Sequence, residues 1–216
     1  MEQLSWACSG IATSLLGNSL PTLALTLAGS DELKRSYLSP LASEPVLAGF
    51  CVTEPETGSD VARLRTRVTE HSDTPILNGE KAWITNATLA RFFVVFATTD
   101  PPRGQRGIAA VVIDRDTPGL SVGAPEDKLG QRASETASVR FEDVRVAREE
   151  LLAPPAKAFV WRCRCPSGLA RTWARWPPAR VVPADGRQAL PGIPGPTRGL
   201  VPPTATRPPA RGRLGR

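Results

Sequence analysis

The stretch TEPETGSD, residues 53–60, combines residue types that can bind an anion or a polar ring. Gly58 allows close backbone approach and left-handed dihedral angles. Successive backbone N–H groups in such a loop can form a concave anion site, and the hydroxyls of Thr53 and Ser59 add further hydrogen-bonding groups. The same residue types are common turn formers, so a solvated surface turn is the alternative interpretation.

Two further stretches place polar side chains in strand-like sequence. In WIT, residues 83–85, Thr85 follows an aromatic and an aliphatic residue, and in FATTD, residues 96–100, Thr99 ends an apolar run. Taken alone, Trp83 could be an ordinary core residue and Thr85 an ordinary strand residue. A site is therefore indicated by the stretches in order, and not by any one of them.

The chain has four cysteines, Cys8, Cys51, Cys163 and Cys165. No histidine lies near them to complete a set of metal ligands, because the single histidine, His71, is distant in sequence. We expect unpaired thiols of a reducing compartment and no metal site. We count no apolar run of transmembrane length, and neither a basic leader nor an Arg/Ser-rich one opens the chain. We therefore expect no membrane span and no targeting presequence.

The first elements along the chain are predicted to be helices. Residues 2–16 have apolar side chains at mostly helical spacing, and Gly17 suits a helix stop. A second apolar run ends at Gly29, and Ser30-Asp31 can cap a third helix over residues 32–42. Three consecutive helical pieces therefore open the chain.

After Pro45 the apolar period changes to that of strands. We expect six or seven short strands between Val46 and Val146, which favours an antiparallel sandwich or barrel. Asn78-Gly79 lies between two strand-like segments and is the strongest short hairpin signal, so we expect a turn there.

Charge and proline divide the chain at Pro154. From there onward 11 Arg and 1 Lys face a single acid, Asp185, which leaves residues 1–153 with −5 of the total net charge of +6. Thirteen of the 22 prolines also lie in residues 154–216. Such a segment cannot bury enough surface to offset its chain entropy, and we expect it to be disordered.

Three motifs in order carry a family resemblance. TEPETGSD, LNGEKAWITN (residues 77–86) and KLGQRASETASVRFEDVRV (residues 128–146) resemble the acyl-CoA dehydrogenase family, and the opening ACSGIATSLLGNSL looks most like its medium- and short-chain members. The resemblance covers residues 1 to about 160. It leaves the acyl chain length open.

The resemblance implies an α+β fold. Residues 1–45 would be the C-terminal part of the family's N-terminal helical domain, and residues 46–153 its middle antiparallel β-barrel domain, which binds flavin. Residues 154–216 would be a Pro/Arg-rich tail translated out of frame, with the family's C-terminal helical bundle missing. The codons permitted for residues 160–163 allow a shifted frame that reads Val-Ala-Met, as the family continues.

The resemblance also implies an FAD site and its residues. The Thr-Glu-Pro loop would wrap around the flavin and its diphosphate, Thr85 would reach the hydride acceptor N5, and Ser59 and Thr99 would contact the acyl-CoA. An acid at Glu56 is unusual for the family, and it is unfavourable near a diphosphate unless it points to solvent. The implied FAD-binding residues are Phe50, Cys51, Val52, Thr53, Gly58, Ser59, Trp83, Ile84 and Thr85.

The implied reaction is α,β-dehydrogenation of a fatty acyl-CoA to a trans-2-enoyl-CoA, a step of fatty-acid β-oxidation. Family members pass their electrons to an electron-transferring flavoprotein, and they form oligomers through the C-terminal bundle, so we do not expect a tetramer of this chain. Relatives are cytoplasmic in bacteria and lie in the mitochondrial matrix in eukaryotes. The family's catalytic base is a Glu of that bundle, and this chain has no Glu after Glu150.

Two alternatives follow from these observations. In one, the chain is a catalytically inactive fragment that retains only part of the FAD and acyl-CoA site. In the other, the Arg-rich tail binds nucleic acid, with Trp161, Trp173 and Trp176 as stacking groups. Charge with scattered Trp is a weak signal, and we do not expect a nucleic-acid partner.

Overall fold

The structure is a computed structural model that describes residues 1–71 and 74–153. The predictions for the segment 154–216, including its Trp residues, lie outside these residues. Helices occupy the first part of the chain, and the last of them ends at Ser43. Strands follow from Leu47 to Ala153.

The predicted first helix is two helices. The backbone of Cys8 is extended, and it separates α1 (Glu2–Ala7) from α2 (Ser9–Gly17). Asn18 then joins α2 to α3 (Ser19–Ala28) with a helical backbone. Gly17 is thus the last residue of α2, as its sequence position predicted.

The third helical piece begins at the predicted cap. The Ser30 hydroxyl accepts a hydrogen bond from the Leu33 backbone N–H, which satisfies a free donor at the helix start. The piece runs through α4 (Asp31–Leu33), the π-helical turn η1 (Lys34–Leu38) and α5 (Ser39–Ser43).

The strands form one eight-stranded sheet within the described residues, in the order β6-β7-β3-β2-β4-β5-β8 with β1 on β4. Most pairings are antiparallel, as predicted, but β1 and β2 each pair with β4 in parallel. The strands are β1 (Leu47–Cys51), β2 (Arg67–His71), β3 (Thr74–Thr85), β4 (Ala90–Thr98), β5 (Ile108–Asp114), β6 (Leu120–Val122), β7 (Thr136–Arg145) and β8 (Leu151–Ala153). Short 3₁₀ turns lie between them, namely η2 (Val61–Arg63), η3 (Pro101–Gly107) and η4 (Arg148–Glu150).

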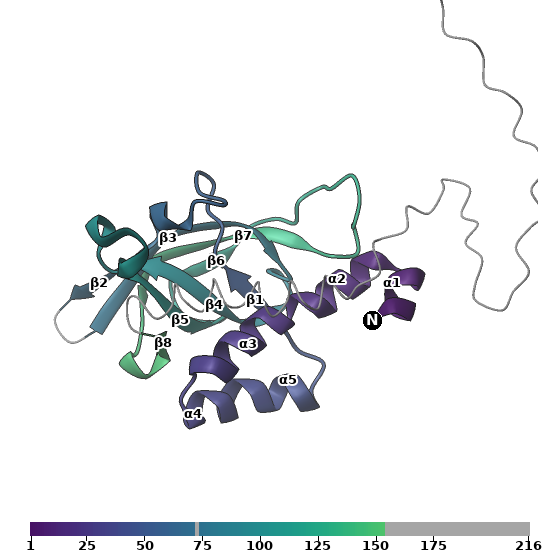
Figure 1. Cartoon of the computed structure of the whole chain (residues 1–216), viewed down its shortest axis with the longest axis horizontal. Coiled ribbons are helices and arrows are strands. Elements are labelled where there is room, and N and C mark those ends of the chain that lie inside the picture. The colour runs from purple at the N-terminus through teal and green to yellow at the C-terminus, as the bar shows by residue number, and fades with distance from the viewer. Residues whose placement is uncertain (72–73, 154–216) are drawn as a thin grey trace, which may run out of the picture. The chain divides into compact units, whose positions relative to one another are not determined.

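The sheet is buried on both faces at β4 and β5. Phe92, Val94 and Phe96 of β4 lie in a core shared with Leu25 of α3 and Leu33 of α4. The alternating residues Phe93, Val95 and Ala97 lie in a second core formed with side chains of β3 and β7, such as Leu77, Val139 and Phe141. The helices therefore cover one face of the sheet, and the sheet coils so that β3 and β7 cover the other (Figure 1).

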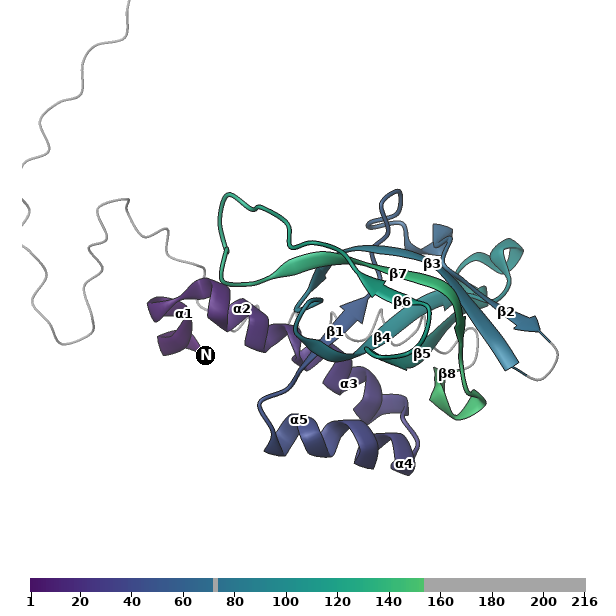
Figure 2. The same ribbon diagram turned by 180° about the vertical axis from the view of Figure 1, so that it is seen from behind.

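The loop between β6 and β7 connects the sheet to α2. The Thr13 hydroxyl donates to the Gln131 side-chain oxygen at 2.9 Å, and the Gln131 side-chain nitrogen donates to the Ser9 hydroxyl at 3.2 Å. Gly10 of α2 lies so close to the loop that a Cβ there would be 3.0 Å from Ala133 Cβ. Both views show this loop reaching over α2 (Figure 2).

The expectation that no apolar run reaches membrane-spanning length is wrong. Ser9–Ala28 is a 20-residue helical stretch of mean hydropathy 1.3, long and apolar enough to cross a membrane. In this structure part of the stretch packs against β1 and β4, and 22% of its most apolar window is buried. Leu25 is fully buried, and the Asn18 side chain binds the Val46 carbonyl and the Ala48 N–H, which tie the stretch to β1.

The predicted turn at Asn78-Gly79 is also wrong, because β3 runs through both residues. The hairpin instead joins β2 to β3, where His71 pairs with Thr74. Gly79 has φ of +142° in a register shift against β7, and the backbone of Thr66 lies directly beside it. Asn78 binds Asp143 across the sheet through its side-chain amide. Asn78 and Gly79 therefore allow neighbouring segments to approach a bulged strand closely, and they do not form a turn that reverses the chain.

Candidate functional site

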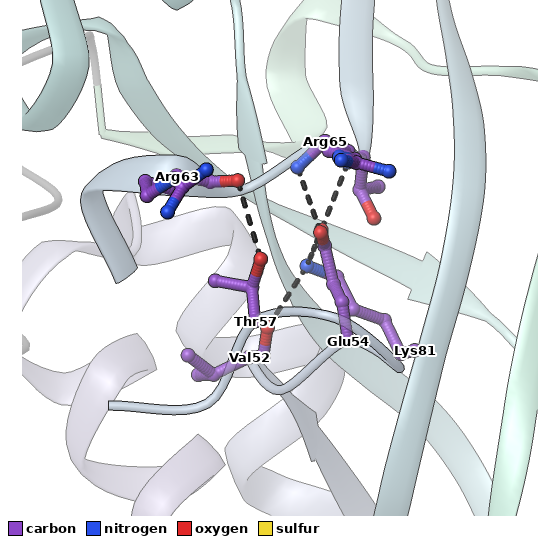
Figure 3. Close-up of polar contacts among 7 residues, drawn as sticks. Val52, Glu54, Thr57, Arg63, Arg65 and Lys81 are labelled. Carbon is purple, nitrogen blue, oxygen red and sulfur yellow. Dashed lines mark hydrogen bonds and ion pairs between the residues drawn. The ribbon is translucent and has the colours of Figure 1, made fainter. Parts of the chain in front are cut away.

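The Thr-Glu-Pro loop, residues 53–60, follows β1 and begins with a tight turn. The Glu54 and Thr57 backbones exchange two hydrogen bonds, of 2.9 Å and 3.1 Å, and the Thr57 hydroxyl donates to the Arg63 carbonyl at 3.3 Å. Figure 3 shows these residues around the loop. The turn formers of this stretch therefore build an ordered loop, in which Thr57 is buried and Gly58 and Ser59 are exposed.

A buried ion pair lies beneath the loop. The Lys81 ammonium is 2.9 Å from the Glu54 carboxylate and also donates to the Val52 carbonyl at 3.0 Å. The same carboxylate accepts the backbone N–H groups of Arg65 at 2.7 Å and Thr66 at 2.8 Å. Side-chain exposure is 0% for Lys81 and 4% for Glu54, so both charges are shielded from water.

The environment shifts the pKa of each partner. Burial alone would raise the pKa of Glu54, but the Lys81 charge and the hydrogen bonds at the carboxylate outweigh it and hold that pKa below its usual value. Burial lowers the pKa of Lys81, and Glu54 offsets part of this effect. The contacts at the Glu54 carboxylate therefore favour its charged form.

Trp83 is presented to solvent by a bulge in β3. The pairing of β3 with β7 shifts register between Lys81 and Ile84, and Trp83 between them has φ of +60°. A left-handed backbone at a bulky residue is a genuine outlier, which points to a constraint from function. The side chain is 60% exposed, unusual for a Trp in a sheet.

The bulge and the loop are joined by the backbone. The Ala82 N–H donates to the Thr53 carbonyl at 2.9 Å, which places half-buried Thr53 beside the residue that precedes Trp83. Thr53 and Trp83, two predicted site residues that are distant in sequence, are thus brought together at one edge of the loop. A bulge that re-aims a side chain beside a polar loop is typical of active sites.

The end of β3 lies against α2. A Cβ at Gly17 would be 3.1 Å from the Asn86 side-chain nitrogen and 3.2 Å from Thr85 Cγ2. The Asn86 amide donates to the Ser14 carbonyl at 2.9 Å. Half-buried Thr85 is therefore held between the strand and the helix.

The remaining predicted residues differ in what their side chains can reach. Cys51 and Ile84 are buried in the core, and burial raises the pKa of the Cys51 thiol to about 12. Phe50 is half-buried and stacks edge-on against Phe96. Exposed Thr99 donates to the Gly107 carbonyl at 3.0 Å, at the start of η3, which lies against η2. No hydrogen bond within the described residues joins Ser59 or Thr99 to Trp83, and their roles stay predictions.

Glu56, the unusual acid of the loop, points to solvent. Its carboxylate pairs with Arg65, and the two side chains are 63% and 71% exposed. An acid that points to solvent was the condition under which the sequence analysis found Glu56 compatible with a diphosphate nearby.

The sequence interpretation missed Glu54, Lys81 and Asn86 as organising residues. A signal for Lys81 was available, since it shares the strand alternation of buried Leu77 and of Gly79. A charged residue at an inward position of a strand predicts a buried partner. Nothing comparable marked Glu54, which reads as one turn former among several.

Acid should weaken the structure through Glu54. Between the lowered pKa of the folded state and the usual value of about 4.3, the unfolded chain binds more protons than the folded one. The free energy of unfolding therefore falls as the pH falls through this window. Urea unfolding from pH 5 to pH 3, about the range that matters, should give a shallower pH slope for Glu54→Gln than for the parent. A larger change of slope from exposed Glu56→Gln would contradict this.

A separate cavity of about 330 Å³ lies on the helical side, lined in part by Tyr37, Arg91 and Asp114. Burial and the nearby acids Asp114 and Glu150 raise the pKa of Tyr37. None of the predicted site residues lines this cavity. Among the described residues, no group of three His, Cys, Asp or Glu side chains could hold a metal ion.

Known proteins resemble this chain over most of the described residues. The profile of the acyl-CoA dehydrogenase middle domain matches residues 49–144. A probable medium-chain specific acyl-CoA dehydrogenase 2, mitochondrial, of Caenorhabditis briggsae is 43% identical over 162 residues, which are 74% of this chain and 40% of that protein.

Solved structures of the same fold agree. Butyryl-CoA dehydrogenase of Megasphaera elsdenii aligns with a TM-score of 0.71 at 36% identity, over 74% of this chain and 42% of that one. A glutaryl-CoA dehydrogenase of Mycobacterium smegmatis in complex with FADH2 aligns with a TM-score of 0.66 at 34% identity, over 73% and 40%. The chain spans 40–42% of the length of these three relatives.

Proposed function

Since residues 49–144 place this chain in the acyl-CoA dehydrogenase family, we propose that its described part forms the flavin-facing half of an FAD-dependent acyl-CoA dehydrogenase. The proposed reaction is α,β-dehydrogenation of a fatty acyl-CoA to a trans-2-enoyl-CoA. One observation carries the proposal above the others, namely the strained and exposed Trp83 beside Thr53.

The residues at this place fit a flavin. A planar aromatic ring system needs a flat apolar surface, and the exposed indole of Trp83 offers one. The backbone and hydroxyl of Thr53 supply polar groups next to it, and a diphosphate suits the exposed amides at Gly58 and Ser59. Around Gly58 nothing lies within 4 Å of the position of a Cβ, so the loop is open to a ligand.

The protein's own residues would bind, orient and shield the reactants. FAD would supply the hydride-accepting chemistry when bound. Trp83 would cover one face of the ring, Thr53 and Thr85 would donate hydrogen bonds to its edge, and Ser59 and Thr99 would hold the acyl-CoA. We propose an electron-transferring flavoprotein as the acceptor.

A second candidate function is flavin binding without turnover by this polypeptide alone. It is favoured by the composition after Glu150, where Asp185 is the one acid and Glu is absent. Proton abstraction from the thioester needs a base within hydrogen-bond reach. Neither Glu54 nor Glu150 is free for this role, because the first is paired with Lys81 and the second accepts the Ala147 N–H.

Flavin reduction separates the two candidates. The chain purified with FAD should retain yellow flavin absorbance, since the binding loop and Trp83 are both ordered. Butyryl-CoA and octanoyl-CoA are then added without oxygen. Bleaching of the flavin would support dehydrogenation, whereas bound flavin that stays oxidised would support binding without turnover. A chain that retains no FAD would overturn the proposed function.

A further inference from the structure

The buried pair of Lys81 and Glu54 has a use beyond joining two strands. The two charged groups bind each other, and together they also bind the Val52 carbonyl and the Arg65 and Thr66 amides (Figure 3). Neither charged group forms a hydrogen bond with Thr53 or Trp83. What the pair touches is the backbone on both sides of Thr53.

Burying such a pair is a weak way to stabilise a fold. Desolvation of two charges offsets most of their attraction, and apolar residues of similar volume often serve as well. A nearby inward position of β3 is the apolar Leu77, which is also fully buried. The presence of two buried charges here is therefore better explained by the backbone geometry that they impose than by a gain in stability.

The geometry is a clamp on three successive residues. Lys81 fixes the Val52 carbonyl, the Ala82 N–H fixes the Thr53 carbonyl, and the Glu54 carboxylate is fixed by Lys81 and the amides of the returning chain. Lys81 and Ala82 immediately precede Trp83 at the bulge. The same few atoms thus set the position of Thr53 and the start of the bulge together.

We propose that Lys81 and Glu54 are positioning residues for the flavin, which hold Thr53 and Trp83 at the spacing that FAD requires. This rests on the proposed function. The two residues act through backbone that they anchor, and a misplacement of about 1 Å in such a constellation is costly. Both were absent from the set of ligand-binding residues implied by the sequence.

The test separates positioning from stability by removing both charges. In the double variant Glu54→Gln/Lys81→Met no charge is left buried and unpaired, so the chain should still fold, with its melting temperature lowered only through the backbone groups that lose a partner. The glutamine introduced at position 54 has one carbonyl oxygen for the two amides of Arg65 and Thr66, and the methionine introduced at position 81 has no donor for the Val52 carbonyl. The clamp is therefore lost while the core is kept filled.

Three readouts are taken on the full chain. FAD affinity is measured by calorimetry, stability by thermal unfolding, and the anchoring of Arg65 and Thr66 by amide hydrogen exchange. The double variant should bind FAD about tenfold or more weakly and exchange those amides about tenfold or more faster. The control Glu44→Gln/Arg91→Met removes the exposed ion pair between residues 44 and 91, which belong neither to the loop nor to the bulge, and should change neither.

Each outcome decides the inference. Parent-like FAD affinity in the double variant would overturn it. It would also be overturned if the double variant and the control lost FAD affinity in proportion to their loss of stability. If the parent itself binds no FAD, the proposed function fails. Unchanged exchange at Arg65 and Thr66 would in that case overturn the clamp as well, and faster exchange would support it independently of the flavin.

Discussion

Gly79→Ala should lower the free energy of unfolding by about 3 kcal/mol. A Cβ at this position would lie 2.6 Å from the Thr66 Cα, which is backbone and cannot rotate away. The φ of +142° adds strain for any side chain. Because the Thr66 N–H binds Glu54 and its carbonyl accepts the Thr98 N–H, displacing Thr66 would disturb the loop and the sheet together. Urea unfolding followed by circular dichroism measures the change.

Gly130→Ala is the matched control for this substitution. Nothing lies within 4 Å of the position of its Cβ, and its backbone is not in the left-handed region. An open, exposed site should change the free energy of unfolding by no more than about 0.5 kcal/mol. Equal losses from the two variants, or no loss from Gly79→Ala, would contradict the close approach of β3 to Thr66.

The elements of this fold were largely predictable because each has a clear period or cap. The Ser30 cap, the helix end at Gly17 and the strands after Pro45 all follow from local sequence. Asn78-Gly79 was not predictable in the same way. A dipeptide that favours a tight turn also suits a bulge, and only the packing of Thr66 against Gly79 decides between them.

The parallel pairings of β4 escaped sequence reasoning for a related reason. Phe92 to Ala97 read as one apolar run, and such a run does not tell which strands flank it. Its neighbours are chosen by long-range contacts in two separate cores, one under the helices and one under β3 and β7.

For the site, sequence reasoning named residues that we propose to face a ligand, and it missed two residues that hold the loop around them. Thr53 and Trp83 were named, and the Ala82 bond to Thr53 brings them together. Glu54 and Lys81 act from inside, where their role depends on a partner across the sheet. A pairing between positions so far apart in sequence is a property of the fold and not of either motif.

Trp83→Gly should weaken FAD binding by about 10- to 100-fold and at the same time leave the chain as stable or more so, by up to about 1 kcal/mol. The affinity falls because the indole would supply the flat surface for the flavin. The stability does not fall because a side chain that is 60% exposed buries little, while glycine accepts φ of +60° without strain. Calorimetric FAD titration and thermal unfolding measure the two effects.

Trp6→Gly tests whether the combination of weaker FAD binding with unchanged or higher stability is specific to the bulge. Trp6 is 62% exposed, almost as much as Trp83, but it lies in α1, where glycine is unfavourable by about 1 kcal/mol. We expect no gain in stability and parent-like FAD affinity from this variant. Parent-like FAD affinity in Trp83→Gly would remove Trp83 from the flavin site, and a clear loss of stability would show that its backbone is not strained. Affinity lost together with stability gained would mean that the fold tolerates a strained, exposed Trp for the sake of its ligand.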